Sequence, residues 1–171
     1  EIRFRFPPAP RGGMLVLELE GVEKVYPGGR PVLRGLDFSL ERGDRLAVLG
    51  VNGAGKSTFA RLLAGVEPMT AGRRKPGHNA IVSYFAQDHA DSLDPRKTVL
   101  QTVQEVVPAG ADLNLRTLLG CFLFRGDDVF KSVSVLSGGE RSRLALARML
   151  LVPSNCLILD EPTNHLDMRS Q

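Results

Sequence analysis

Several short stretches of the chain are rich in apolar residues, and in Leu36–Leu40 apolar and polar residues alternate with the period of two that is typical of strands. The segments are short, bounded by glycine, proline or charged residues, and rich in aliphatic side chains. They are Met14–Leu19, Leu36–Leu40, Arg45–Leu49, Ala80–Phe85 and Cys156–Leu159. We expect the first two to be antiparallel, with turns at 27–29 and 41–44. The third is the mostly apolar kind that lies buried in an α/β sheet.

Three other stretches have apolar residues at helical spacing, and each begins with a helix-start signal. The first follows a glycine-rich loop, the second begins at a Thr-x-x-Gln capping box, and the third begins at a serine followed by two glycines and ends before Pro153. Helical pieces should continue from the second to about Phe124. The predicted apolar faces are Phe59, Leu62, Leu63 and Val66; Val99, Val103, Val106 and Val107; and Leu144, Ala147 and Leu151.

Composition places the chain among globular proteins. It has 171 residues, of which 43% are hydrophobic and 24% charged, enough for one domain with a sizeable core. Two cysteines cannot form a disulfide scaffold, so we expect Cys121 and Cys156 to be reduced core thiols in a reducing cytosol. No apolar run is long enough to span a bilayer. The net charge of +3 is too weak to predict nucleic-acid binding.

The first residues are rich in proline and glycine and cannot form a helix or a central strand. We interpret residues 1–13 as an interdomain linker and residues 14–171 as the folded domain. Because the chain opens with Glu1 and lacks the apolar segment of a signal peptide, we expect it to be a piece of a longer polypeptide.

A phosphate-binding loop is predicted between the Arg45–Leu49 strand and the first helix. The residues Gly50, Val51, Asn52, Gly53, Ala54, Gly55, Lys56 and Ser57 match G-x-x-x-x-G-K-[ST] in the strand–loop–helix context that the motif requires. Glycines let backbone N–H groups converge on an anion, and the helix N-terminus adds its dipole. Lys56 suits the β and γ phosphates and Ser57 suits Mg²⁺. We include Thr58 among the nucleotide-binding residues.

The last predicted strand ends on two carboxylates, Asp160 and Glu161. At the carboxyl end of a buried strand such groups face the crevice where ligands bind, so Asp160 suits Mg²⁺. Glu161 could orient or deprotonate a water that attacks the γ-phosphate, a role worth about 10²- to 10⁴-fold in rate. A helix cap or an exposed turn acid is the structural alternative for this pair.

The sequence Leu136-Ser137-Gly138-Gly139-Glu140 resembles the signature of ATP-binding cassette (ABC) proteins. Physically it is a second anion site, made by the Ser137 hydroxyl, the Gly138 and Gly139 amides and a helix N-terminus. The resemblance implies a P-loop NTPase (RecA-like) α/β core with a parallel sheet, an N-terminal antiparallel β subdomain and a helical subdomain at about 92–152. It also implies that this signature closes over ATP held by a partner cassette.

Three further positions match the family. Gln87 stands where the family's glutamine contacts Mg²⁺ and the attacking water, and Tyr26 stands where an aromatic ring stacks on adenine. Leu166-Asp167 resembles the loop that touches the partner domain. The resemblance thus implies ATP and Mg²⁺ as cofactors, with Glu161, Gln87 and Lys56 as catalytic residues and Ser57, Gln87 and Asp160 as metal ligands.

Within the family, the stretch from Glu161 to Asp167, Glu-Pro-Thr-Asn-His-Leu-Asp, resembles the ABC-F subfamily. Its members have two cassettes in one chain and no membrane domain, and most act on ribosomes. The resemblance therefore implies a cytoplasmic ATPase that pairs with another cassette and binds the ribosome, as a translation factor or in antibiotic resistance. The segment around Phe4-Arg5-Phe6 and the Leu118–Asp128 region indicate the second cassette.

The sequence departs from the family pattern in one respect. The family's switch histidine follows the Glu161 position by a few tens of residues, whereas the printed chain stops at Gln171. His78 and His89 are expected to be solvated loop residues, and His165 belongs to the motif just described. We therefore expect the fragment alone to hydrolyse ATP weakly or not at all.

Two other functions share these motifs. The nucleotide-binding subunit of an ABC transporter has the same phosphate-site residues, and a non-catalytic nucleotide-binding module would have some of them. Intact Lys56, Asp160 and Glu161 disfavour the second. The basic run Arg73-Arg74-Lys75 is expected to be a solvated loop, and the helix arginines Arg141, Arg143 and Arg148 to pair with acids or line a domain interface. We derive no RNA contact from them.

Overall fold

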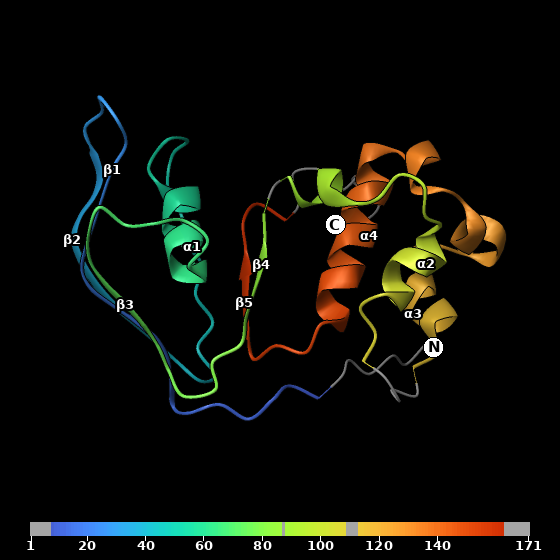
Figure 1. The fold of residues 1–171 in the computed structure, drawn as a ribbon, viewed down its shortest axis with the longest axis horizontal. Helices are drawn as coiled ribbons and strands as arrows, with labels where there is room; N and C mark the ends of the chain where they lie inside the picture. The colour runs from blue at the N-terminus through green and yellow to red at the C-terminus, as the bar shows by residue number, and fades with distance from the viewer. Residues whose placement is uncertain (1–7, 87, 109–112, 163–171) are drawn as a thin grey trace. The chain divides into compact units, whose positions relative to one another are not determined.

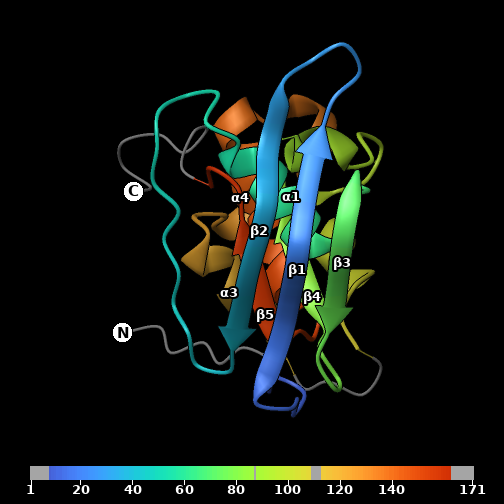
Figure 2. The same cartoon turned by 90° about the vertical axis from the view of Figure 1, so that its left-hand side faces the viewer.

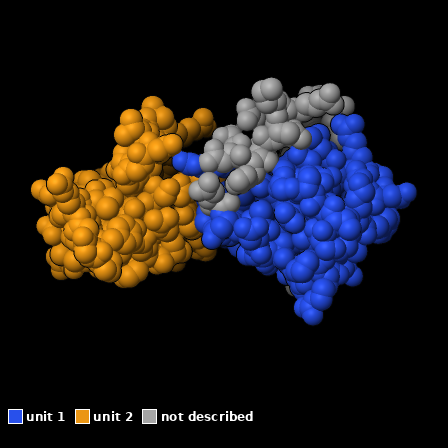
Figure 3. All heavy atoms as spheres, turned by 90° about the horizontal axis from the view of Figure 1, so that it is seen from above, with its two compact units in different colours: residues 1–8, 85–153, 161–171 blue, residues 9–84, 154–160 orange. Residues whose placement is uncertain are grey.

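The computed structural model describes residues 8–86, 88–108 and 113–162. Its contacts separate into two compact units, coloured in Figure 3. The sheet unit consists of residues 9–84 and 154–160, and the helical unit is built on residues 85–153 together with the described end residues Pro8, Glu161 and Pro162. Each has its own hydrophobic core.

The sheet unit begins with an antiparallel sheet of three strands, β1 (Leu15–Val25), β2 (Pro31–Glu41) and β3 (Ala71–Pro76). Their order is β2-β1-β3, and Figure 2 shows β1 in the middle. In the register, Leu19 lies opposite Phe38 on β2 and Arg74 on β3. Alternation along β1 buries Leu17 and Leu19 on one face, as a period of two requires.

Helix α1 (Lys56–Ala64) lies between this sheet and a two-stranded sheet of β4 (Val82–Phe85) and β5 (Cys156–Leu159), as Figure 1 shows. Leu62 and Leu63 of α1 are buried in the core of the sheet unit, and Cys156 of β5 belongs to the same core. The Phe59 ring meets Phe38 edge-on, with centroids 5.4 Å apart. The helix therefore links the antiparallel sheet to the strand that ends at Asp160.

The helical unit surrounds α4 (Gly138–Leu151) with α2 (Val99–Gln104), α3 (Leu115–Cys121) and three 3₁₀ turns, η1 (His89–Ser92), η2 (Gly126–Phe130) and η3 (Val133–Val135). The predicted face of α4 is confirmed, because Leu144, Ala147 and Leu151 are fully buried. That of α2 is confirmed for Val99 and Val103 only, because the helix ends at Gln104 and leaves Val106 and Val107 half-buried beyond it. The capping box at Thr98 is also present. Within the part of the chain that the structure describes, no helix is long and apolar enough to cross a membrane.

The predicted strand Arg45–Leu49 is wrong. The turn before it is present, with the Asp44 amide donating to the Glu41 carbonyl at 3.2 Å, but residues 45–49 form no ladder with any described segment. Leu46 is 52% exposed and Leu49 is 90% exposed. An apolar run becomes a strand only where a neighbour takes up its backbone hydrogen bonds.

Several smaller expectations also fail. Val66 is exposed because α1 ends at Gly65, whose φ of 76° takes the chain out of the helix. Cys121, the last residue of α3, is exposed rather than part of the core. His89 is half-buried, with its ring stacked on Phe85 and its Nδ1 accepting from the Ala86 amide.

The basic run is not a loop. Arg73, Arg74 and Lys75 lie in β3, whose antiparallel pairing with β1 sets Glu20 opposite Arg73 and Glu18 opposite Lys75. Cross-strand charge pairs follow from that register: Arg73 pairs with Glu20 at 3.1 Å, and Lys75 pairs with Glu18 and Glu20. Two of the three basic residues are therefore paired with acids of their own sheet, while Arg74 Nε donates to the Leu63 carbonyl of α1 at 2.8 Å.

Candidate phosphate-binding site

The loop from Gly50 to Ser57 leads directly into α1. Gly53 and Gly55 have φ values of 80° and 92°, a left-handed backbone that glycine adopts without strain. Gly55 is the N-cap of α1, which has neither a side-chain cap hydrogen bond nor an acidic residue in its first turn. The first amides of this described helix are thus left for an external acceptor, and the helix dipole favours an anion there.

Gly55 is also required by packing. A Cβ built on it would lie 2.7 Å from Val32 Cγ1 of β2, closer than carbon atoms approach without displacement. The start of α1 therefore lies directly against the antiparallel sheet. Any side chain here would displace the phosphate loop as well as strain its backbone.

The Lys56 ammonium lies over the same loop. Its Nζ donates to the carbonyls of Gly50 at 2.9 Å and Val51 at 3.1 Å. Both acceptors are backbone atoms of the loop, so the charge is held beside its amides. A polyphosphate bound by those amides would meet a cation that can exchange two carbonyl acceptors for phosphate oxygens.

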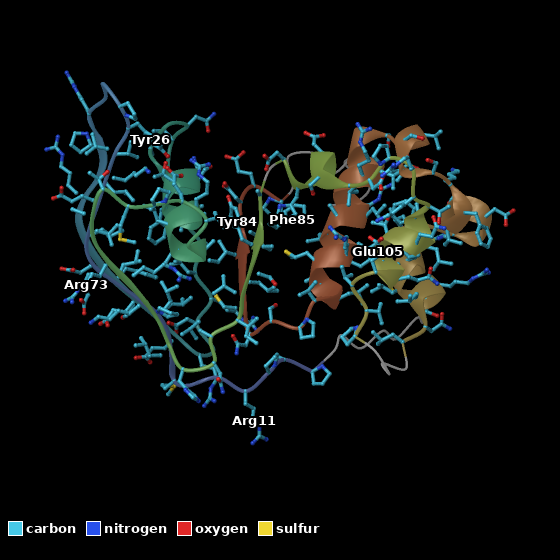
Figure 4. All side chains as sticks on the ribbon, viewed as in Figure 1. Arg11, Tyr26, Arg73, Tyr84, Phe85 and Glu105 are labelled. Carbon is cyan, nitrogen blue, oxygen red and sulfur yellow. The ribbon has the colours of Figure 1, made fainter. Side chains whose placement is uncertain are left out.

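Asp160, at the end of β5, meets the phosphate loop. Its Oδ1 accepts from the Ser57 hydroxyl at 3.0 Å, and its Oδ2 accepts from the Tyr84 hydroxyl of β4 at 3.3 Å. The carboxylate is only 7% exposed. Sequence reasoning did not assign a role to Tyr84, although its position near the end of β4 parallels that of Asp160 after β5. Figure 4 labels Tyr84 and Tyr26.

The same oxygens fit a magnesium site. Mg²⁺ binds proteins through one or two carboxylates plus substrate phosphates and keeps several waters, and Asp160 and Ser57 offer adjacent oxygen ligands beside the phosphate loop. Among the described residues no group of three or more His, Cys, Asp or Glu side chains could hold a metal by itself. A metal at Asp160 and Ser57 would therefore share its coordination with the nucleotide.

Tyr26 follows β1 in the sheet unit, and its hydroxyl lies 3.2 Å from Thr58 Oγ1 in the first turn of α1. The Arg61 guanidinium donates to the same hydroxyl at 3.3 Å, and the Lys24 ammonium lies 4.9 Å from the ring centroid. The structure thus connects Tyr26 to the residue that follows Ser57. Sequence reasoning did not identify Lys24 or Arg61, although the alternation of β1 places Lys24 on its buried face.

The second predicted anion site opens α4 in the helical unit. Ser137 and Gly138 are exposed, and a Cβ on Gly138 would meet no atom within 4 Å. Ser137 Oγ accepts from the Glu140 amide at 3.2 Å, while the Ser137 amide donates to Glu140 Oε2 at 2.8 Å. That backbone hydrogen bond holds the pKa of Glu140 below its ordinary value. The side chain and the amide of Ser137 are thus both engaged with Glu140 in a capping box.

Glu161 is half-buried and has a φ of 48°, a left-handed conformation that is uncommon for a residue with a side chain. Such backbone geometry clusters at functional sites. Gln87, His165 and Leu166-Asp167 lie outside the described residues.

Comparison with known proteins gives a consistent answer. The ABC transporter family matches residues 33–164. ABC transporter F family member 5 of Arabidopsis thaliana is 38% identical in an alignment that covers 100% of this chain and 25% of that protein. The energy-dependent translational throttle protein EttA of Haemophilus influenzae is 40% identical in an alignment that covers 96% of this chain and 30% of that protein. The chain spans about a quarter of the length of these relatives.

Solved structures agree with the fold. A bacterial Atm1-family ABC exporter with ATP bound has a TM-score of 0.77 and 25% identity, covering 95% of this chain and 32% of its own. A dimeric ATP-binding cassette in a post-hydrolysis state, bound to ADP and phosphate, has a TM-score of 0.72 and 21% identity. The match covers 90% of this chain and 77% of that chain. The predicted P-loop α/β fold and the resemblance to the ABC-F subfamily are confirmed. The chain belongs to the ABC transporter family, as an ATP-binding cassette whose relatives include ABC-F proteins.

Proposed function

We propose that this chain is the ATP-binding and ATP-hydrolysing cassette of a cytoplasmic ABC-F protein that acts on the ribosome. The observation that carries the nucleotide assignment is the contact of Ser57, at the start of α1, with Asp160 at the end of β5, 3.0 Å apart. It joins the two motifs that an NTPase needs at one place: a loop of amides for phosphate and a carboxylate for the metal.

The reaction we propose is in-line attack of water on the γ-phosphate of ATP. Loop amides and Lys56 bind the phosphate oxygens and neutralise the charge that grows on them. Mg²⁺, held through Ser57, Asp160 and Gln87, would add further neutralisation when bound. Glu161 positions the attacking water and accepts its proton. Tyr26 stacks on adenine, and the residues from Gly50 to Thr58 bind the triphosphate.

The partner we propose is another cassette. Ser137, Gly138 and Gly139 form a helix N-terminus whose first two residues are exposed, which suits a phosphate offered from outside the helical unit. The dimeric cassette with bound ADP and phosphate supports the pairing. We keep residues 1–13 as the interdomain linker and place the chain as the second cassette.

Action on the ribosome is supported by relatives rather than by a surface of this chain. One relative is named a translational throttle protein, at 40% identity. The alternative is the nucleotide-binding subunit of an ABC transporter. The structural similarity to the ABC exporter supports this alternative. Both share the nucleotide site, so only a partner measurement separates them.

The test uses Glu161→Gln in the full-length protein, with ribosome co-sedimentation in the presence and absence of ATP. Because the amide of this variant cannot take a proton from water, we expect ATP to be retained and the protein to pellet with ribosomes only when ATP is present. Ordinary turnover by the variant would refute the role of Glu161. An absence of any ATP-dependent shift would favour the transporter subunit.

A further inference from the structure

A cluster of charged side chains lies beside Tyr26 in the sheet unit. Lys24 is only 8% exposed, and its ammonium makes an ion pair of 2.8 Å with Glu67 and donates to the Pro68 carbonyl at 2.6 Å. Arg61 Nε pairs with the other carboxylate oxygen of Glu67 at 2.6 Å. Glu67 therefore joins a cation from β1 to a cation from α1.

Both of these cations also contact Tyr26. The Lys24 ammonium lies over the ring, 4.9 Å from its centroid, and Arg61 Nη2 donates to the hydroxyl at 3.3 Å. The same hydroxyl lies 3.2 Å from Thr58 Oγ1. The ring is thus held on one face by a cation and at its edge by the first turns of α1.

The electrostatics of the cluster depend on Glu67. Its side chain is 14% exposed, and although burial alone would raise its pKa, hydrogen bonds from Lys24, Tyr26 and Arg61 outweigh burial and lower the pKa to about 2. The same carboxylate is the main reason that the pKa of Arg61 is raised. Replacing Glu67 with a neutral residue would leave the nearly buried Lys24 without its counter-charge, a costly arrangement.

The loop that carries Glu67 is itself attached to the end of β1. Thr70 Oγ1 accepts from the Val25 amide at 3.0 Å and lies 3.3 Å from the Val25 carbonyl, and the Thr70 amide donates to the Glu23 carbonyl at 2.8 Å. The loop is therefore attached to β1 on the C-terminal side of Glu67.

We propose that Glu67 is a positioning residue for base recognition: through Lys24 and Arg61 it fixes one face and the edge of the Tyr26 ring, leaving the other face for the adenine of ATP. This inference rests on the proposed function, because it concerns the base end of the same nucleotide. It assigns base affinity to a glutamate that lies outside the phosphate-binding motif. Cation contact on one face and stacking on the other use both faces of the aromatic ring.

The consequence is a separation between base and phosphate binding. Among the described residues Glu67 forms no hydrogen bond or ion pair with Lys56 or Ser57, whereas it pairs with both cations that hold Tyr26. Glu67→Gln should therefore weaken binding of ATP and leave binding of inorganic tripolyphosphate unchanged. A merely structural role would weaken both ligands alike.

The experiment is calorimetric titration of the chain with Mg-ATP and, separately, with Mg-tripolyphosphate. Stacking of a base on an aromatic ring corresponds to about tenfold in affinity, so we expect ATP to bind Glu67→Gln about tenfold more weakly and tripolyphosphate to bind within about twofold of wild type. Glu23→Gln, at an exposed glutamate of β1, is the matched control and should leave both affinities unchanged.

Tyr26→Ala and its combination with Glu67→Gln complete a double-mutant cycle. In that background Glu67→Gln should have no further effect on ATP affinity, because the ring through which it acts is gone. Three outcomes would overturn this inference while leaving the proposed function intact. They are an equal loss of affinity for ATP and tripolyphosphate in Glu67→Gln, an unchanged affinity of Glu67→Gln for ATP, and an undiminished effect of Glu67→Gln on ATP affinity in the Tyr26→Ala background. A wild-type chain that binds neither ligand would overturn the proposed function as well.

Discussion

The Ser57 hydroxyl donates to Asp160 Oδ1 at 3.0 Å across 103 positions of sequence. One residue begins a helix and the other ends a strand, and both elements belong to the sheet unit. Tyr84 donates to the second oxygen of the same carboxylate at 3.3 Å. The carboxylate is therefore oriented by two hydroxyls, one of which belongs to the phosphate loop.

This contact predicts the metal dependence of nucleotide binding. Asp160→Asn should lose about tenfold of the ATP affinity that Mg²⁺ supplies, because an amide is a weaker ligand for a hard cation than a carboxylate. Binding of ATP in EDTA should stay within about twofold of wild type. Titration calorimetry with and without Mg²⁺ measures both.

Ser57→Ala should also lose part of the ATP affinity that Mg²⁺ supplies, but a smaller part than Asp160→Asn loses. Asp127→Asn, at an exposed carboxylate of η2, is the control and should bind Mg-ATP as wild type does. An Asp160→Asn variant that keeps the full gain from Mg²⁺ would contradict the metal assignment.

Two glycines should respond in opposite directions to alanine. A Cβ on Gly77 would lie 1.8 Å from the Leu15 carbonyl oxygen, so Gly77→Ala must separate the end of β3 from β1 and should lower the free energy of unfolding by about 1–3 kcal/mol. Gly120 lies within α3 with no atom within 4 Å of a built Cβ. Gly120→Ala should raise the free energy of unfolding by about 0.5–1 kcal/mol.

Urea unfolding of the two variants beside wild type measures this contrast. An unchanged or raised free energy of unfolding in Gly77→Ala would show that the close approach at Gly77 does not limit the fold.

Acid should weaken the cluster around Glu67. The pKa of Glu67 in the folded protein is lowered to about 2 from an ordinary 4.5, burial being outweighed by hydrogen bonds from Lys24, Tyr26 and Arg61. A carboxylate with a depressed pKa contributes stability that is fully present above about pH 4.5 and is lost as the pH falls toward 2. The stability difference between wild type and Glu67→Gln should therefore shrink over that window.

Urea unfolding at several pH values, from about 6 down to the lowest pH at which the protein is still folded without urea, measures this difference, with Glu23→Gln as the control variant. A difference that does not change with pH would mean that the charge of Glu67 contributes nothing.

Local signals predicted most of the elements. The capping boxes at Thr98 and Ser137, the glycine-rich loop before α1 and the short apolar run before Asp160 each specify their own conformation through nearest neighbours. The glycine-rich loop and the apolar run before Asp160 carry the candidate phosphate site. The site was therefore visible in the sequence because its parts are local motifs.

The larger failures depend on partners distant in sequence. Arg45–Leu49 has the composition of a strand but no ladder partner among the described segments, and the basic run of β3 becomes a strand because β1 offers Glu18 and Glu20 opposite it. The cluster of Lys24, Arg61 and Glu67 was also missed. Its members come from a strand, a helix and a loop, and only the fold shows that they meet at Tyr26.

The central claim is that the loop from Gly50 to Ser57 binds a triphosphate with the help of Lys56. The most direct test is calorimetric titration of the chain and of Lys56→Ala with Mg-ATP and with Mg-tripolyphosphate, beside Lys131→Ala as a control in a surface ion pair. The loss of a charge-assisted hydrogen bond predicts binding of both ligands weakened about 10- to 100-fold in Lys56→Ala and unchanged in Lys131→Ala. Equal affinities of wild type and Lys56→Ala for both ligands would contradict the account.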